Sequence, residues 1–296
     1  MAVIDNTTLH TDENVGIEQE VLKTFDGSYN ALADVLGIVT PTIVPAGTTL
    51  RTTTVDVTLN ATSYTEGDEI PVSKVTAKKS IIDEATPSYY RTLTTEKTAL
   101  TAGYITAVLT ADTKLLGKVR ASIVSQFYTD LLAAATKGKH SGANLQAALA
   151  NVDAELADAL ENGNDSSDET VHFINRFDAA EYLGDAAIST QTAFGLTYLE
   201  SFLGIPRVII TSKVPSGTVL ATPTANLKVY GIDIAGLQAG YTVSDSGLIG
   251  IKHGHVDERA AYQTILITGM KIKPEVTNYL VSETISKTTS TSPAGA

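Results

Sequence analysis

The chain has 296 residues, of which 43% are hydrophobic and 18% are charged, so it can bury a sizeable core and is globular by composition. Its formal net charge of −12 argues against a protein that grips nucleic acid tightly, because that binding requires clustered lysine and arginine. The absence of cysteine excludes disulfides, cysteine-ligated metals and cysteine nucleophiles.

The N-terminal region is predicted to be a polar arm followed by an irregular helix. Residues 1–5 lack the basic start of a signal peptide, and no apolar stretch is long enough to cross a membrane, so synthesis in a cytoplasm is expected. Residues 1–13 are polar and acidic, which predicts a flexible arm. Apolar positions over residues 17–36 predict a helix that breaks near Gly27, and the proline-containing residues 38–45 predict an edge strand or linker.

A long β arm with two limbs is predicted next. Val55 and Val57 alternate with polar residues, which indicates a half-exposed strand over residues 50–59, and a second limb is expected over residues 87–100. The stretch between these limbs is far longer than the roughly two to five residues of an ordinary hairpin loop. Because a solitary two-stranded ribbon is marginal in water, we expect this arm to lie across a neighbouring subunit.

Residues 112–136 give the strongest helix pattern in the chain. Apolar residues recur at every fourth position, at Leu115, Val119, Ile123, Phe127 and Leu131. Asp112 or Thr113 is the expected N-cap, and Gly138 is expected to end the helix. The helix is long enough to serve as a spine between regions that do not otherwise touch, and residues 137–142 after it are predicted to form a short basic turn.

The rest of the chain alternates between helical and strand patterns. A second helix carries apolar positions from Leu145 to Leu160 and ends before Gly163. Short helices are expected over residues 178–183, with Asp178 as N-cap, and over residues 198–203. Apolar strands are expected over residues 171–175, 207–211, 219–221, 227–230, 247–253 and 262–272. The order predicts a mixed α+β fold, and residues 286–296 are predicted to be a flexible tail.

His253 and His255 are the best candidate metal ligands. Residues two apart on a strand share a face, so both imidazoles would reach one ion. However, Gly254 interrupts the strand pattern and no third ligand is evident, so a turn between strands is the alternative interpretation.

Charged residues are distributed unevenly along the chain. An acidic group lacks the spacing of a calcium loop and is interpreted as a solvated face: Asp153, Glu155, Asp158, Glu161, Asp165, Asp168, Glu169, Asp178, Glu181 and Asp185. The arm is basic, through Lys74, Lys78, Lys79, Arg91 and Lys97. These cations either keep an exposed hairpin soluble or complement the acidic surface of the next copy.

One segment of the arm resembles a known family. Residues 64–74 read Tyr-Thr-Glu-Gly-Asp-Glu-Ile-Pro-Val-Ser-Lys and resemble the Tyr-x-Glu-Gly-x-x-Ile-Pro segment in the extended loop of many major capsid proteins of tailed bacteriophages. The long helix, the α/β middle and the late strand pair over residues 252–274 follow in the same order. Over about residues 46–285 the chain is similar to that family, whose fold is named after phage Hong Kong 97.

The resemblance implies a structural protein without catalytic residues, metal or cofactor, which self-assembles into pentamers and hexamers of an icosahedral phage head. The implied domains are an N-terminal arm (1–36), an extended loop (50–100), a peripheral domain with the spine helix (37–49, 101–140 and 269–285), an axial domain (141–268) and a flexible tail (286–296). The implied residues of inter-subunit contact are Tyr64, Glu66, Asp68, Glu69, Lys74, Lys78, Lys79 and Arg91.

The implied partners are further copies of the chain, a separate scaffolding protein, a portal and, as a further candidate, a decoration protein. Such a head encloses DNA without sequence-specific binding, involves no membrane and is assembled in the cytoplasm of a host bacterium. The alternatives are an encapsulin-type nanocompartment shell and, from another class, a secreted β-rich binding module. The sequence contains no nucleophile elbow, phosphate-binding loop or dinucleotide fingerprint, so an enzyme is not expected.

Overall fold

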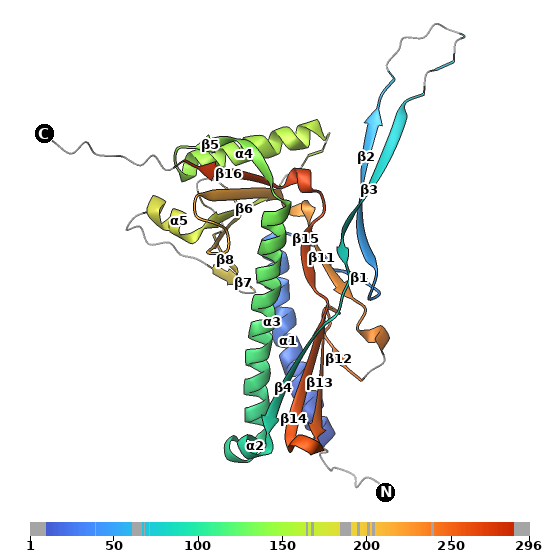
Figure 1. Ribbon diagram of the computed structural model, residues 1–296, viewed down its shortest axis with the longest axis vertical. Helices are drawn as coiled ribbons and strands as arrows, with labels where there is room; N and C mark the ends of the chain where they lie inside the picture. The colour runs from blue at the N-terminus through green and yellow to red at the C-terminus, as the bar shows by residue number, and fades with distance from the viewer. Residues whose placement is uncertain are drawn as a thin grey trace, which may run out of the picture.

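The molecule is built along one long helix, α3 (Tyr104–Ala134), which joins an α/β end to a β-rich end (Figure 1). The computed structural model describes residues 10–38, 40–60, 67, 69–70, 72–163, 165–166, 169–183, 191–193, 196–199, 202, 205–237 and 240–286. The predicted apolar stripe of α3 lies in the main core, where Leu116, Val119, Phe127 and Leu131 are buried. The spine helix is therefore confirmed.

The ends of α3 differ from the prediction. The helix begins at Tyr104, because residues 104–111 contain no helix breaker and Gly103, at φ 85°, separates α3 from the short helix α2 (Glu96–Ala102). Asp112 consequently lies inside the helix and is not its N-cap. The helix ends at Ala134, and Gly138 lies in the strand that follows. None of the helices in the described residues is both long and apolar enough to cross a membrane.

A seven-stranded sheet forms the α/β end. Its order is β5 (Thr136–Gly142), β16 (Val281–Ile285), β10 (Thr218–Pro223), β6 (Thr170–Asn175), β9 (Val208–Thr211), β8 (Leu196–Leu199) and β7 (Gln191–Ala193). Helix α4 (Leu145–Asn162) packs on β5, β16 and β10, and α5 (Arg176–Leu183) follows β6. The buried strands over residues 171–175 and 207–211 and the α4 stripe are confirmed.

Two predictions at this end are wrong. The basic turn expected over residues 137–142 is strand β5, which pairs in parallel with β16 and so gains partners that its own sequence does not indicate. The described residues of the helix expected over residues 198–203 are not helical, because residues 197–199 pair with the buried strand β9 and Phe202 forms a β-bridge with Ile205. In both cases pairing with a distant strand outweighs the local pattern.

Two further sheets lie beside the spine. The four-stranded sheet has the order β12 (Thr242–Val243), β13 (Ile249–Val256), β14 (Ala261–Thr268) and β4 (Ser88–Thr95). The three-stranded sheet has the order β1 (Thr42–Val44), β11 (Leu227–Ile232) and β15 (Lys271–Pro274). Short 3₁₀ turns connect these strands: η1 (Thr224–Asn226), η2 (Ala235–Leu237), η3 (Asp257–Arg259) and η4 (Thr277–Tyr279). Gly254 lies inside β13 and does not interrupt it.

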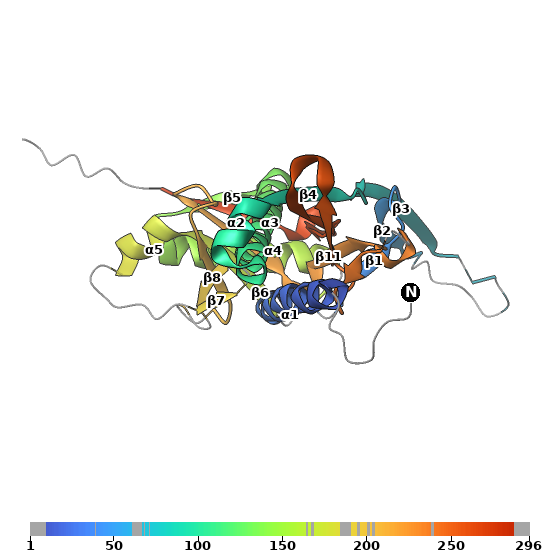
Figure 2. The ribbon, with the colours of Figure 1, turned by 90° about the horizontal axis from the view of Figure 1, so that it is seen from below.

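The N-terminal helix α1 (His10–Leu36) belongs to the body of the molecule. It lies along α3 and the four-stranded sheet, on one face of the molecule (Figure 2). Phe25 and Leu32 are fully buried in the main core, and Gly37, at φ 67°, follows the last turn. The predicted break near Gly27 is wrong, because burial of the flanking apolar residues offsets the roughly 1 kcal/mol cost of a helical glycine.

A two-stranded ribbon, β2 (Thr49–Thr58) and β3 (Lys74–Glu84), projects from the body and is here called the arm (Figure 1). The predicted pairing of its limbs is wrong. The residues expected to form the second limb make β4, which pairs with β14 and places Tyr90 against the main core. The true second limb is β3, which lies in the stretch expected to be a long excursion.

Candidate assembly interface

The two faces of the arm carry different chemistry. Val55 pairs with Ala77 and Val57 with Val75, so these four side chains lie on one face, next to the pair of Thr53 and Lys79. Val55 is 61% exposed, Val57 is 51% exposed and Val75 is 64% exposed. The opposite face carries hydroxyl and charged side chains: Thr52, Thr54, Asp56, Thr58, Lys74, Thr76, Lys78 and Ser80. An isolated ribbon with an uncovered apolar face gains stability when a partner covers it.

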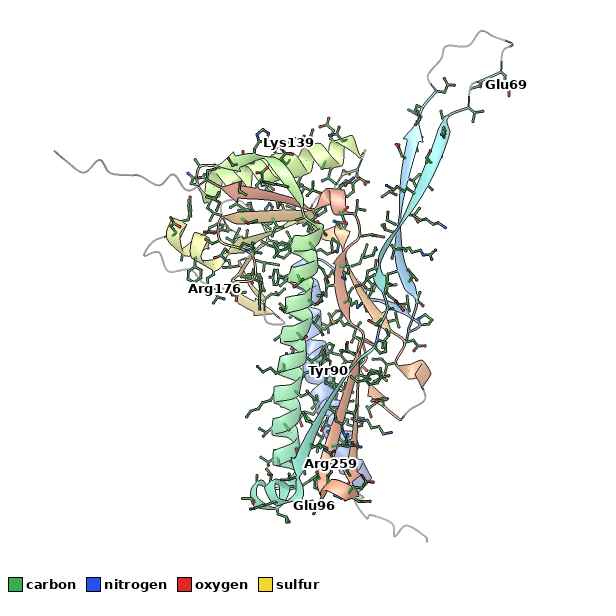
Figure 3. All side chains as sticks on the ribbon, viewed as in Figure 1. Glu69, Tyr90, Glu96, Lys139, Arg176 and Arg259 are labelled. Atoms are coloured by element: carbon green, nitrogen blue, oxygen red, sulfur yellow. The ribbon has the colours of Figure 1, made fainter. Side chains whose placement is uncertain are left out.

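Four of the predicted contact residues lie on the arm or near its tip: Glu69, Lys74, Lys78 and Lys79. All four are exposed, and Glu69 lies near the tip (Figure 3). Arg91 is also exposed, but it lies on β4 rather than on the arm. The remaining three lie outside the described residues: Tyr64, Glu66 and Asp68. Contact of any of these residues with a second subunit stays a prediction.

Ion pairs fix the base of the arm to the body. Nζ of Lys273 lies 2.8 Å from Oδ2 of Asp83 at the end of β3 and 2.7 Å from Oδ2 of Asp130 on α3. Nζ of Lys271 lies 3.1 Å from Oδ1 of Asp83 and donates to the carbonyl of Glu84. Burial raises the pKa of the Asp83 carboxyl, but hydrogen bonds from Lys273, the Glu84 N–H and Lys271 outweigh it and lower the pKa to about 2.

A small apolar cluster supports these ion pairs. Leu50 and Ala85, at the two ends of the ribbon base, are buried with Ile267 of β14. The backbone N–H of Ala85 donates to the carbonyl of Thr48 at 2.9 Å. This base could not be predicted from the sequence, because Asp83 and its partners come from three distant segments and no spacing within the chain links them. Only the alternation of apolar and polar residues over Val75, Thr76 and Ala77 indicates that a strand precedes Asp83.

His253 joins three elements through two carboxylates. Its Nδ1 lies 3.0 Å from Oε1 of Glu18 on α1, and its Nε2 lies 2.7 Å from Oδ2 of Asp112 on α3. The side chains are 2%, 8% and 0% exposed, in the order His253, Glu18 and Asp112. Burial lowers the pKa of the imidazole, but hydrogen bonds to Asp112 and Glu18 outweigh it and raise the pKa to about 9. The cluster is therefore a buried ionic clasp between α1, β13 and α3.

The two histidines do not converge on one site. His255 lies 2.8 Å from Glu96 and 2.5 Å from Asp257, so each imidazole has its own pair of carboxylates on its two nitrogens. In the part of the chain that the structure describes, no group of histidine, aspartate and glutamate side chains has a geometry that would hold a metal ion. The pairing with Glu18 and Asp112 could not be read from the sequence, where these residues lie far from His253.

The acidic group does not form a single solvated face. Asp178 is 3% exposed and accepts hydrogen bonds from the Ser216 hydroxyl at 2.7 Å and the Gly217 N–H at 2.6 Å. Asp153 lies 2.7 Å from Nε2 of the buried His172. Glu161, Glu169 and Glu181 are exposed as expected, whereas Asp168 and Asp185 lie outside the described residues. Part of the group therefore holds the α/β end together.

Similarity to known proteins is visible in the fold and not in the sequence. The sequence matches no protein-family model and no curated protein sequence. The fold resembles the capsid of a native GTA particle, with a TM-score of 0.55 and 9% identity over 85% of this chain and 90% of that one. It also resembles a structure from Gordonia phage Cozz, with a TM-score of 0.54 and 12% identity over 85% and 86% of the two chains.

A third similar structure comes from outside the phages. A virus-like particle from Pyrococcus furiosus matches with a TM-score of 0.50 and 14% identity, covering 90% of this chain and 96% of that one. These matches cover 85–90% of this chain. The chain therefore has the α+β fold of the Hong Kong 97-type capsid proteins, which the resemblance of residues 64–74 predicted.

Proposed function

We propose that this chain is the major capsid protein of a tailed bacteriophage, which self-assembles into pentamers and hexamers of an icosahedral head around DNA. The observation that carries the proposal is the exposed apolar face of the arm, formed by Val55, Val57, Val75 and Ala77. A second copy of the chain is the proposed occupant of that face. The similarity of the fold to the capsid of a GTA particle supports a role in a shell.

The arm is a thin ribbon that would gain stability if a partner covered its exposed valines. Each exposed valine contributes up to about 1.5–3 kcal/mol when it is fully buried, so covering three of them favours association strongly. The ion pairs of Asp83 hold the arm in one direction before it meets its partner, which reduces the entropy lost on binding. Many such contacts around a ring would give a stable shell from individually modest interfaces.

The domains of the capsid family can be assigned to the elements of this fold. In our proposal the arm is the extended loop, which is shorter than the predicted residues 50–100. The seven-stranded sheet with α4 and α5 is the axial domain, and α1, α3 and the four-stranded sheet form the peripheral domain. Helix α1, predicted to be part of an N-terminal arm over residues 1–36, is assigned to the peripheral domain because its apolar residues lie in the main core; residues 1–9 lie outside the described residues.

The proposal includes partners and a location. A separate scaffolding protein and a portal would act with the chain during assembly in the host cytoplasm, and the product would be the head of the virion. The net charge of −12 supports a wall that encloses DNA without holding it. The chain is proposed to act as a structural protein and not as an enzyme.

The test compares assembly of the protein with and without its apolar arm face. We expect the natural chain to form shells, rings or tubes in sedimentation and negative-stain electron microscopy. Replacing Val55, Val57 and Val75 by threonine keeps strand propensity but removes the apolar face. The concentration needed for assembly is expected to rise by more than about tenfold, while the free energy of unfolding of the subunit changes by less than about 1 kcal/mol.

A matched control carries three conservative substitutions on the opposite face: Thr54→Ser, Thr58→Ser and Thr76→Ser. This control should assemble as the natural chain does. A natural chain that stays monomeric, alone and with the proteins encoded beside it, would contradict the proposal, as would normal assembly of the threonine variant. Nucleic acid extracted from particles that assemble together with a portal would indicate a phage head, whereas a nanocompartment shell would enclose none.

A further inference from the structure

A pocket of about 460 Å³ lies between the middle of α3, the end of β9 and the start of α5. Three cationic side chains line it: Arg120, Arg176 and Lys213. Three hydroxyl side chains line it as well: Thr197, Thr211 and Ser212. Its apolar lining includes the buried Val124, Leu196 and Ile210, and no aspartate or glutamate is among the described residues that line it. We call it the basic pocket.

Of the three cations, Arg120 is half-buried, whereas Arg176 and Lys213 are exposed at the rim, and their partners differ from those of the buried Lys273 and the half-buried Arg207. Lys273 is paired with two aspartates, and Arg207 lies 3.1 Å from Glu169. In contrast, Arg120, Arg176 and Lys213 form no ion pair with any carboxylate in the part of the chain described. Three cationic side chains thus line one cavity, and no carboxylate of the described residues pairs with them.

Arg120 is held in place by a neutral partner. Its Nη1 donates to the hydroxyl of Ser28 on α1 at 2.6 Å, which orients the guanidinium. Burial lowers the pKa of the Arg120 guanidinium, since no carboxylate offsets the loss of water around it. Burying an uncompensated cation is costly, and an anion bound in the pocket would offset that cost.

The set of donors fits one kind of anion best. Two guanidiniums and one ammonium offer many N–H donors, and guanidinium matches phosphate oxygens with two parallel hydrogen bonds. A phosphate group brings three or more acceptor oxygens and up to two negative charges, whereas a carboxylate brings two oxygens and one charge. A volume of about 460 Å³ leaves room for the group that carries the phosphate, against the apolar side of the pocket.

We propose that the basic pocket binds a phosphate group, presented either by a small phosphorylated molecule or by a nucleic-acid strand. Arg176 and Lys213 bind the phosphate from the rim, and the oriented guanidinium of Arg120 binds it from inside the pocket. The proposal rests on this pocket alone and does not depend on shell formation.

The experiment titrates the purified full chain with pyrophosphate at low ionic strength and measures heat by calorimetry. The pocket variant combines Arg176→Gln and Lys213→Gln and leaves Arg120 with its Ser28 partner. The control combines Lys114→Gln and Lys118→Gln, two exposed lysines of α3 outside the pocket, and loses the same charge. We expect saturable binding of one pyrophosphate per chain, a loss of affinity of about tenfold or more in the pocket variant, and a change below about twofold in the control.

Competition identifies the source of the phosphate. If a single-stranded oligodeoxynucleotide displaces pyrophosphate, the site takes strand phosphates; if it does not, the site takes a small phosphorylated molecule, and either result supports the proposal. Three results would overturn it: no saturable binding by the natural chain, equal losses in the two variants, or displacement by a polyglutamate peptide as effective as by phosphate. Sedimentation of the same samples shows whether shells form. Absence of phosphate binding can therefore be distinguished from absence of the proposed assembly.

Discussion

At the scale of single residues, the buried clasp of His253 with Glu18 and Asp112 ties α1 and α3 to β13. A second contact strengthens it, since the hydroxyl of Thr242 also donates to Glu18. Removing one partner of a buried ionic group leaves an uncompensated charge, which typically costs more than the group contributed. The clasp therefore yields a mutational prediction and a prediction of pH dependence.

The mutational prediction concerns His253→Gln. We expect this change to lower the free energy of unfolding by about 3 kcal/mol, because Glu18 and Asp112 then face each other without a cation. The control is His255→Gln on the same strand, whose imidazole is 34% exposed and also binds two carboxylates. That change should cost much less than His253→Gln, because water screens exposed ion pairs. Urea unfolding at pH 6 measures both, and equal losses would contradict the clasp.

The pH prediction follows from the direction of the shifts. The pKa of His253 is raised from 6.5 to about 9, so its stabilising contribution is complete below pH 6.5 and is lost as pH rises through 9. Burial raises the pKa of Glu18, but hydrogen bonds from His253 and Thr242 outweigh it and lower the pKa below 4.5, so its contribution is lost as pH falls below that value. The difference in unfolding free energy between the natural chain and His253→Gln should shrink between pH 6.5 and pH 10. A difference that stays constant would show that the imidazole acts only by packing.

At the scale of elements, the arm is a ribbon whose direction depends on its base. Lys273 is the shared partner of Asp83 in β3 and Asp130 in α3, so it connects the arm to the spine. Lys271 reaches only the arm, through Asp83 and the carbonyl of Glu84. Lys273 therefore joins the arm to α3, whereas Lys271 contacts the arm alone.

Replacing Lys273 by methionine should loosen the base of the arm. The change leaves Asp83 and Asp130 facing each other, and we expect a loss of about 2 kcal/mol and faster amide hydrogen exchange at Ala85, which donates to Thr48. Lys271→Met is the control and should affect exchange less, since Lys273 still pairs with both aspartates. Because the pKa of Asp83 is lowered to about 2, the same loosening should appear in the natural chain as pH falls below 3.8. Unchanged exchange in Lys273→Met would contradict a role in anchoring.

The sequence predicted elements whose own periodicity decides their structure. The stripes of α3 and α4 are strongly periodic, and both helices are present. Elements that depend on a distant partner were misjudged: residues 137–142 and 196–199 become strands only because β16 and β9 lie beside them. The clasp and the arm base were missed for the same reason, because contacts such as His253 with Glu18 or Lys273 with Asp83 leave no local pattern.

At the scale of the whole molecule, the proposed assembly would have to bring together copies that each carry a formal net charge of −12. Two contributions compete with this repulsion. One is burial of the apolar face of the arm, which salt does not screen, and the other is attraction between the basic residues of the arm and the acidic surface of a neighbour, which salt weakens. Exposed ion pairs contribute about 0–1 kcal/mol each, less than a buried valine. The balance therefore favours apolar burial as the main driving force.

This balance determines how assembly responds to salt. Raising the ionic strength from about 0.01 M to 0.15 M shortens the Debye length from about 30 Å to 8 Å, which reduces repulsion between subunits while the apolar contact persists. We expect assembly to become faster and to occur at lower protein concentration, as measured by light scattering. Replacing Lys74, Lys78 and Lys79 by glutamine should change the protein concentration needed for assembly only slightly at an ionic strength of about 0.15 M. If salt instead dissolves the assemblies and the lysine variant fails to form them, charge complementarity between arm and neighbour would be the dominant force, and the apolar face would serve only to fix the register.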